Sequence, residues 1–148
     1  MPTPPAAICA AGTLRRATRS ISRVYDAYLA KAGLTTTQYS LLVSLERRDS
    51  PVQLTELAAE QVFERTSLYR ALEPLRREQL IALRDGPGRT KEVSLTPRGS
   101  RRVAEAQPYW QEAQDAFLHA FGRSAWGGLV GQLTEIVAAT RAIPMPGE

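Results

Sequence analysis

The sequence predicts a mainly α-helical fold with a small β-hairpin, an α+β chain. Apolar residues recur at helical spacing through most of its length. After Leu80 the pattern changes to two short strand-like stretches, joined by the turn-rich segment 85–89. Helical spacing resumes after Thr96 and continues almost to the last residue. We therefore expect several helices, one hairpin and two further helices, in that order.

Length and composition are those of a soluble globular protein. The chain has 148 residues, of which 43% are hydrophobic and 23% charged, a balance typical of a folded domain. No apolar stretch could span a bilayer, and residues 1–5 lack the positive start of a signal peptide, so we expect a cytoplasmic protein without a membrane partner. One cysteine and one histidine leave too few ligands for zinc. We expect no metal, no cofactor and no catalytic site.

Local signals place the helices before the hairpin. The first helix should run from about residue 7 to residue 31 and end at Gly33. The segment Thr35-Thr36-Thr37-Gln38 has the form of a capping box at the start of a second helix. Two short helices with leucine stripes follow, separated only by Val62-Phe63-Glu64. Such a brief break is typical of a helix-turn-helix corner.

Strand and helix signals also order the second half of the chain. Segments 81–84 and 92–95 predict the hairpin, and Thr96-Pro97 predicts an N-cap followed by the first position of a long helix. Ser124 should cap a last helix, whose apolar stripe comprises Trp126, Leu129, Leu133, Ile136 and Val137. We expect residues 1–34 and 97–148 to form a helical dimerisation region around a lobe at 35–96, within one compact domain.

Positive charge gathers in the middle of the sequence. Residues 65–102 contain ten Lys or Arg and four acids, a net charge of +6, whereas the whole chain carries +4. A local basic excess suits a partner with a phosphate backbone, although a solvated surface would carry the same charges.

A short helix, a tight turn, a second helix and a charged hairpin together predict a winged helix-turn-helix. The second helix fits the major groove of DNA, and side chains near its start reach base edges. The candidate DNA-binding residues on this helix are Arg65, Thr66, Ser67, Tyr69 and Arg70, whereas Leu68 and Leu72 should face the core. Those on the hairpin, or wing, are Arg84, Arg89 and Lys91.

The chain resembles the MarR family of bacterial transcriptional regulators from about Leu14 to its last helix. The resemblance rests on Leu34-Thr35-Thr36-Thr37-Gln38-Tyr39, Leu57-Ala58, Glu64-Arg65-Thr66-Ser67-Leu68-Tyr69-Arg70, Arg89, Val93-Ser94-Leu95-Thr96 and Gly99. It implies an obligate homodimer that binds a pseudo-palindromic operator in double-stranded DNA, as a repressor released by a small aromatic or phenolic effector. The chain departs from the family at Pro87, where an Asp usually stands two residues before the wing arginine.

The resemblance also implies an effector cleft between the dimerisation helices and the DNA-binding lobe. The candidate aromatic residues are Tyr25, Tyr28, Tyr109 and Trp110. Aromatic residues at helical spacing also occur in cores and dimer interfaces, so either role fits these four.

Cys9 admits two interpretations. Some members of the family sense peroxides through a cysteine near the start of the first helix, held by tyrosines. Cys9 lies about two residues before that position; Tyr25 matches one partner tyrosine, but Thr36 stands at the other. A lone cysteine is commonly a small buried hydrophobe. We therefore expect a structural cysteine, with redox sensing as the alternative.

Two other classes of protein fit the sequence less well. A thiol enzyme using Cys9 would need an activating histidine or a second cysteine, and His119 is the single histidine. A helical interaction module with a basic face would not need a charged hairpin beside a helix-turn-helix. We therefore expect a regulator rather than an enzyme.

Overall fold

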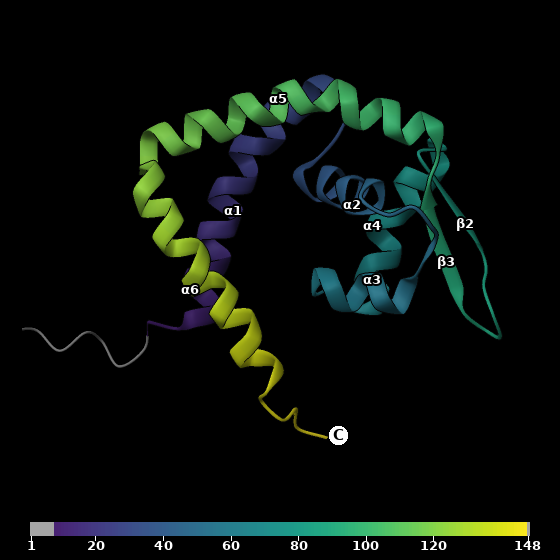
Figure 1. Cartoon of the computed structure of the whole chain (residues 1–148). Helices are drawn as coiled ribbons and strands as arrows, with labels where there is room; N and C mark the ends of the chain where they lie inside the picture. The colour runs from purple at the N-terminus through teal and green to yellow at the C-terminus, as the bar shows by residue number, and fades with distance from the viewer. Residues whose placement is uncertain (1–7, 148) are drawn as a thin grey trace, which may run out of the picture. The chain divides into compact units, whose positions relative to one another are not determined.

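The computed structural model describes residues 8–147, and its elements follow the predicted order (Figure 1). They are α1 (Ala10–Leu29), the 3-10 helix η1 (Ala30–Ala32), α2 (Thr36–Glu46), β1 (Val52–Gln53), α3 (Leu54–Gln61), α4 (Arg65–Arg77), β2 (Ile81–Asp85), β3 (Lys91–Leu95), α5 (Pro97–Phe121) and α6 (Arg123–Arg141). The mainly helical fold with a small wing is confirmed. The chain forms two compact units, Met1–Gln111 and Glu112–Glu148. The division into 1–34, 35–96 and 97–148 stays a prediction.

The ends of the first two helices follow the local signals in the sequence. The chain leaves η1 through Gly33, whose φ of 70° is in the left-handed region that glycine adopts without strain. Both reciprocal hydrogen bonds of the predicted capping box are present. Thr35 Oγ1 accepts from the Gln38 N–H at 3.2 Å, and Gln38 Oε1 accepts from the Thr35 N–H at 2.9 Å. The first helix begins at Ala10 rather than near residue 7.

The corner between α3 and α4 turns on a residue other than glycine. Val62 adopts φ 55° and ψ 44°, a left-handed conformation that costs a β-branched residue energy. The residue is 65% exposed, so burial does not hold it in this conformation. The hydrogen bond from the Phe63 N–H to the Ala58 carbonyl, at 2.8 Å, closes the turn.

The wing is a three-stranded sheet rather than the two-stranded hairpin we expected. β2 pairs antiparallel with β3 from Ile81↔Leu95 to Asp85↔Lys91, and β1 pairs with the other edge of β3 at Val52↔Val93. A two-residue strand is too short to show alternation, which explains why the sequence does not reveal it. The third strand makes β3 central and supports a hairpin that would be marginal alone. The loop between β2 and β3 extends away from α2, α3 and α4 (Figure 1).

A leucine core fastens α4 to its neighbours. The largest fully buried side chains are Leu29, Leu41, Leu42, Leu57, Leu68, Leu72, Leu75, Leu80 and Val93. Three of them, Leu68, Leu72 and Leu75, come from one face of α4, as expected for Leu68 and Leu72. Their burial fixes which face of α4 points to solvent.

The start of α5 is capped as the sequence predicts. Thr96 Oγ1 accepts from the Gly99 N–H at 3.0 Å, and Pro97 is the first helical residue. The prediction for Ser124 is wrong, because the chain turns at Gly122 (φ 105°), α6 already begins at Arg123 and no side chain caps it. No described helix combines the length and hydropathy that a bilayer span requires.

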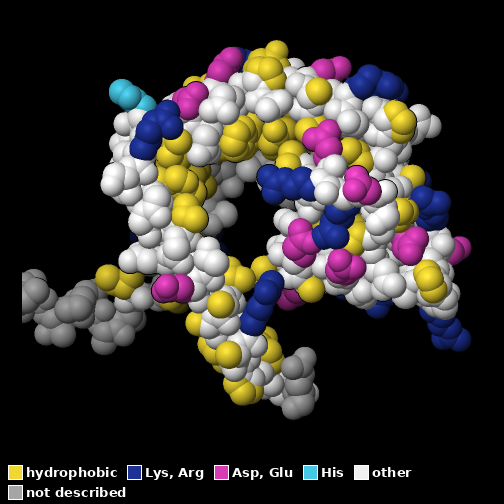
Figure 2. Space-filling view, viewed as in Figure 1, with side chains coloured by type: hydrophobic (Ala, Val, Ile, Leu, Met, Phe, Trp, Pro, Cys, Tyr) yellow, Lys and Arg dark blue, Asp and Glu magenta, His cyan; other side chains and the backbone are white. Residues whose placement is uncertain are grey.

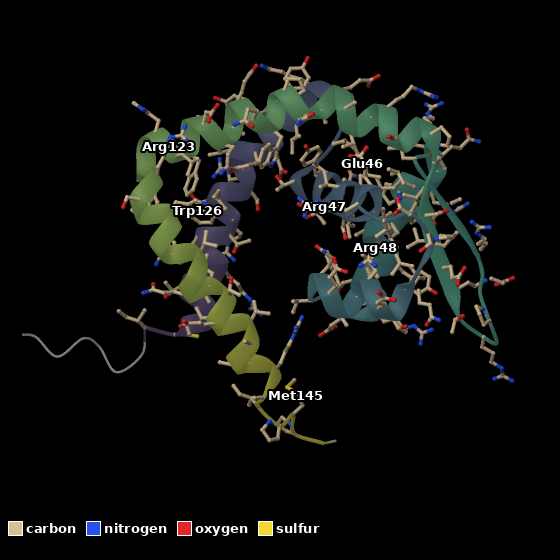
Figure 3. All side chains as sticks on the ribbon, viewed as in Figure 1. Glu46, Arg47, Arg48, Arg123, Trp126 and Met145 are labelled. Atoms are coloured by element: carbon tan, nitrogen blue, oxygen red, sulfur yellow. The ribbon has the colours of Figure 1, made fainter. Side chains whose placement is uncertain are left out.

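Within the second unit, few side chains are shielded. Trp126 of α6 meets the ring of Phe117 edge-on at 5.3 Å (Figure 3). None of the residues of α6 is buried, and Val130, Ile136 and Val137 are each 38–41% exposed. Of the five residues of the stripe predicted for this helix, Ile136 and Val137 are exposed, whereas Trp126, Leu129 and Leu133 are half-buried.

Candidate nucleic-acid interface

The outer face of α4 carries the predicted DNA-contacting residues. All five are exposed: Arg65, Thr66, Ser67, Tyr69 and Arg70. Thr66 and Arg70 lie on the face opposite the buried leucines, whereas Arg65 is exposed in the first turn of the helix, on the side of Leu68. No side chain caps the start of α4, so its first N–H groups are open to an acceptor such as a phosphate oxygen.

Charge is distributed unevenly along α4. Arg65 and Arg70 form no ion pair with any residue in 8–147. Arg76, near the other end, donates to Glu73 at 2.7 and 2.9 Å. This hydrogen bonding raises the pKa of Arg76 and lowers that of Glu73. The first two turns therefore offer free guanidinium groups, whereas the last turn is partly neutralised.

The wing holds its three basic residues in different ways. Arg84 lies opposite Glu92 in the sheet register, and Lys91 Nζ is ion-paired with Asp85 Oδ1, which raises the pKa of Lys91. Arg89 makes no ion pair within residues 8–147. Basic side chains stand out at the far end of the wing (Figure 2).

The residue at the unusual wing position shapes the turn instead of holding Arg89. The Pro87 carbonyl accepts from Thr90 Oγ1 at 2.7 Å, and the Gly86 N–H donates to the Thr90 carbonyl at 2.9 Å. Asp85, the nearby acid, is occupied by Lys91. Within residues 8–147, Arg89 therefore has no acidic partner.

A polar network that sequence reasoning missed ties α2 to α3. Arg48 lies between the two helices (Figure 3), where it is paired with Glu56 at 3.3 Å and with Glu60. Glu60 also accepts from the buried Ser44 hydroxyl at 3.2 Å. The spacing along the chain gives no signal for these contacts, because they depend on the α2–α3 packing. The network fixes the first helix of the helix-turn-helix against α2.

A cleft of about 710 Å³ lies among α2, α3 and the first half of α5. Tyr39, Trp110, Arg47 and Glu60 are among its lining residues. The Trp110 ring stacks on Tyr39 with centroids 6.2 Å apart. Burial and the charge of Glu46 raise the pKa of Tyr39.

Of the four predicted effector residues, only Trp110 lines this cleft. Tyr25 is buried, and Tyr28 lines a separate groove along α1. The rings of Tyr28 and Tyr109 lie 5.7 and 5.4 Å from Lys31 Nζ. The structure therefore does not gather the four predicted effector residues in one place. Tyr39, which lines the cleft, was not among those predicted from the sequence.

Cys9 is exposed, so the expectation of a buried small hydrophobe is wrong. It is the N-cap of α1, and its Sγ accepts from the Gly12 N–H at 3.5 Å. Tyr25 follows 16 positions later, about 24 Å away along a helix that rises 1.5 Å per residue. Thr36 donates its hydroxyl proton to Asp26 at 2.6 Å. Within one chain, no tyrosine from either family position is therefore placed beside Cys9.

An exposed, cationic second helix and a three-stranded wing define a DNA-binding regulator of winged helix-turn-helix class. No protein-family model matches the chain, and a search of curated proteins finds no match either. Among solved structures, the transcriptional regulator MosR of M. tuberculosis in complex with DNA is 33% identical. The similarity covers 93% of this chain and 99% of MosR, with a TM-score of 0.82. This chain therefore belongs to the MarR family of DNA-binding transcriptional regulators.

Two more distant structures share the fold. A MarR-family regulator from Rhodococcus sp. RHA1 is 18% identical, with coverage of 88% of this chain and 96% of that one and a TM-score of 0.75. CouR from Rhodococcus jostii RHA1, bound to p-coumaroyl-CoA, is also 18% identical, with coverage of 84% and 88% and a TM-score of 0.73. These relatives are regulators rather than enzymes, in agreement with the expectation from the sequence.

Proposed function

We propose that this protein is a homodimeric repressor that binds a pseudo-palindromic operator and is released by a small aromatic effector. The observation that carries the proposal is the pair of unpaired arginines, Arg65 and Arg70, on the exposed face of α4. MosR, the relative with 33% identity, was solved in complex with DNA.

On the operator, α4 enters the major groove and the wing follows the flanking backbone. Arg65 and Arg70 donate to guanine edges or phosphates, and Thr66, Ser67 and Tyr69 bond phosphate oxygens. Arg89, free at the tip of the wing, enters the minor groove, where the electrostatic potential is most negative. Arg84 and Lys91 lie along the backbone, and Lys91 shares its charge with Asp85.

The exposed stripe on α6 supports a dimer. Val130, Ile136 and Val137 would each lose most contact with water if a second copy covered them. A two-fold dimer presents two copies of α4, which matches an operator built of two inverted half-sites.

The cleft lined by Tyr39 and Trp110 supports an effector with an aromatic ring. Arg47, which also lines it, forms no ion pair within residues 8–147 and could receive a carboxylate or phenolate. CouR, solved with p-coumaroyl-CoA, shares the fold alone. Ligand binding here would change how α5 packs against α2 and so weaken DNA binding.

Selection of duplexes from a randomised pool tests the DNA-binding part. The wild-type protein should enrich an inverted repeat whose half-site centres lie about 10 base pairs, one helical turn, apart or a multiple of it. A variant with Arg65→Ala and Arg70→Ala should enrich nothing. Enrichment of no sequence by the wild type would refute operator recognition, and enrichment of an asymmetric site would refute symmetric binding by a dimer.

Titration with 4-hydroxybenzoate tests the effector part. The protein contains two tryptophans, so Trp126→Phe leaves Trp110 as the single indole reporter. Quenching of its fluorescence, together with release of the selected duplex, would support the cleft. The same response in an Arg47→Ala variant would place the ligand elsewhere.

A further inference from the structure

The first turns of α5 fasten the corner where α4 turns into β2. The Thr96 hydroxyl donates to the Gln79 carbonyl at 2.6 Å, and the Thr96 N–H donates to the Leu80 carbonyl at 3.1 Å. Three residues further on, a Cβ added to Gly99 would lie 2.1 Å from the Leu80 oxygen. The backbone at the start of α5 therefore packs directly against the turn between α4, the recognition helix, and β2.

Arg102 continues this row one turn later. Positions 96, 99 and 102 share one face of a helix because residues three apart lie side by side. Arg102 NH1 lies 3.2 Å from Glu78 Oε2, at the C-cap of α4. Its own-helix neighbour Glu105 is more distant, at 3.9 Å.

Arg102 is sheltered, unlike the candidate DNA-contacting arginines. Its side chain is 18% exposed, and its NH1 would lie 3.4 Å from a Cβ added to Gly33. It therefore touches the end of α4 and comes close to the turn before α2. A paired and sheltered guanidinium is placed to hold elements together rather than to bind phosphate.

We propose that Arg102 is a positioning residue for operator binding. Its ion pair with Glu78 anchors the C-terminal end of α4, and the helix transmits this anchor to the groove-facing residues in its first two turns. Backbone hydrogen bonds of α4 close this corner, from the Gln79 N–H to the Arg76 carbonyl and from the Leu80 N–H to the Leu75 carbonyl, both at 2.9 Å. The Arg102–Glu78 pair adds a side-chain anchor from α5. The inference rests on the DNA-binding role proposed for α4.

The decisive variant is Glu78→Gln, because its effect on charge and its effect on the ion pair would change DNA affinity in opposite directions. Removing a negative charge near a polyanion strengthens binding by electrostatics alone. Loss of the anchor weakens it. We expect Glu78→Gln and Arg102→Gln each to weaken binding to the selected duplex roughly three- to fivefold, the range of a partly exposed ion pair. Glu105→Gln, with the same change in net charge, should not weaken it.

A double-mutant cycle and a salt titration complete the test. The double variant Arg102→Gln/Glu78→Gln should bind no more weakly than either single variant, because both remove the same ion pair. Arg102→Gln should keep the wild-type slope of log affinity against log salt, whereas loss of a phosphate contact lowers that slope by about one. Arg102→Lys should restore part of the affinity.

Failure of the positioning role can be distinguished from failure of folding and from failure of the proposed function. Stronger binding by Glu78→Gln, additive losses in the double variant, or a lowered salt slope for Arg102→Gln would each overturn the positioning role. If Arg102→Gln does not fold, Glu78→Gln decides, because it alters a side chain that is 44% exposed. If the wild type selects no duplex, the proposed function fails before this inference is tested.

Discussion

Lys91 is ion-paired with Asp85, the residue directly opposite it in the register of the wing. The pair occupies Asp85, and Arg89 has no acidic partner within residues 8–147. Of the three basic residues of the wing, Lys91 therefore shares its charge with an acid, whereas Arg84 and Arg89 form no ion pair within residues 8–147.

This arrangement predicts different effects of substitutions at the Arg89 and Asp85 positions of the wing. Arg89→Ala should weaken binding to the selected duplex and lower its salt slope by about one, because a phosphate or minor-groove contact is lost. Asp85→Asn should strengthen binding, because it frees Lys91. Electrophoretic mobility shifts over a range of salt concentrations measure both. Weaker binding by Asp85→Asn would mean that the pair shapes the wing and that its charge is secondary.

Arg70 and Arg76, both on α4, can be compared as test and control positions, because Arg70 has no ion pair within residues 8–147 and Arg76 is paired with Glu73. Arg70→Ala should weaken specific binding by about 1–3 kcal/mol, the value of a good base contact. Arg76→Ala should cost less, because Arg76 is already bonded to Glu73. Fluorescence anisotropy with the selected and a scrambled duplex separates the two roles. Equal losses on both duplexes would show that Arg70 binds phosphate and does not read bases.

Local signals in the sequence predicted most helices and strands. The features that they did not predict depend on tertiary packing. The capping box at Thr35 and the N-cap at Thr96 act within four residues, so the sequence alone reveals them. β1 exists only because β3 lies beside it, and the Asp85–Lys91 pair exists only in this register.

The same reason limits what could be predicted of the site. Leu68 and Leu72 fix the outward face of α4, so its exposed residues could be predicted from periodicity. The cleft could not, because Tyr39 and Trp110 meet across α2 and α5. The fastening of α4 by Arg102 likewise depends on the packing of α5.

Gly99 should be intolerant of a side chain. A Cβ there would lie 2.1 Å from the Leu80 carbonyl oxygen, which is backbone and cannot move aside freely. Gly99→Ala should lower the free energy of unfolding by about 1–3 kcal/mol, as overpacking does. Gly131→Ala is the control: nothing lies within 4 Å of its added Cβ. It should raise stability by roughly 0.5–1 kcal/mol through helix propensity. Urea unfolding measures both, and a neutral Gly99→Ala would contradict the close approach.

The uncovered stripe of α6 predicts where the dimer can be broken. Ile136→Glu places a charge on the stripe in both copies, so it should dissociate the dimer into monomers or unfold it. Ala138→Glu places the same charge away from the stripe and should leave the dimer intact. Sedimentation equilibrium at micromolar concentration distinguishes these results. A folded wild-type monomer under those conditions would contradict an obligate dimer.

The last prediction concerns oxidation of Cys9, whose exposed side chain is accessible to oxidants. We expect Cys9→Ser to keep the wild-type affinity for the selected duplex, and mild hydroperoxide to change wild-type binding little. The chain has no second cysteine to resolve a sulfenate, and Thr36, at the position where the family resemblance implies a tyrosine for sensing, is bonded to Asp26. A disulfide between the Cys9 residues of two copies is the route by which oxidation could still act. The experiment is a titration with an organic hydroperoxide, followed by DNA binding and a non-reducing gel. Loss of binding that Cys9→Ser prevents, with or without a crosslinked dimer, would establish Cys9 as a redox sensor.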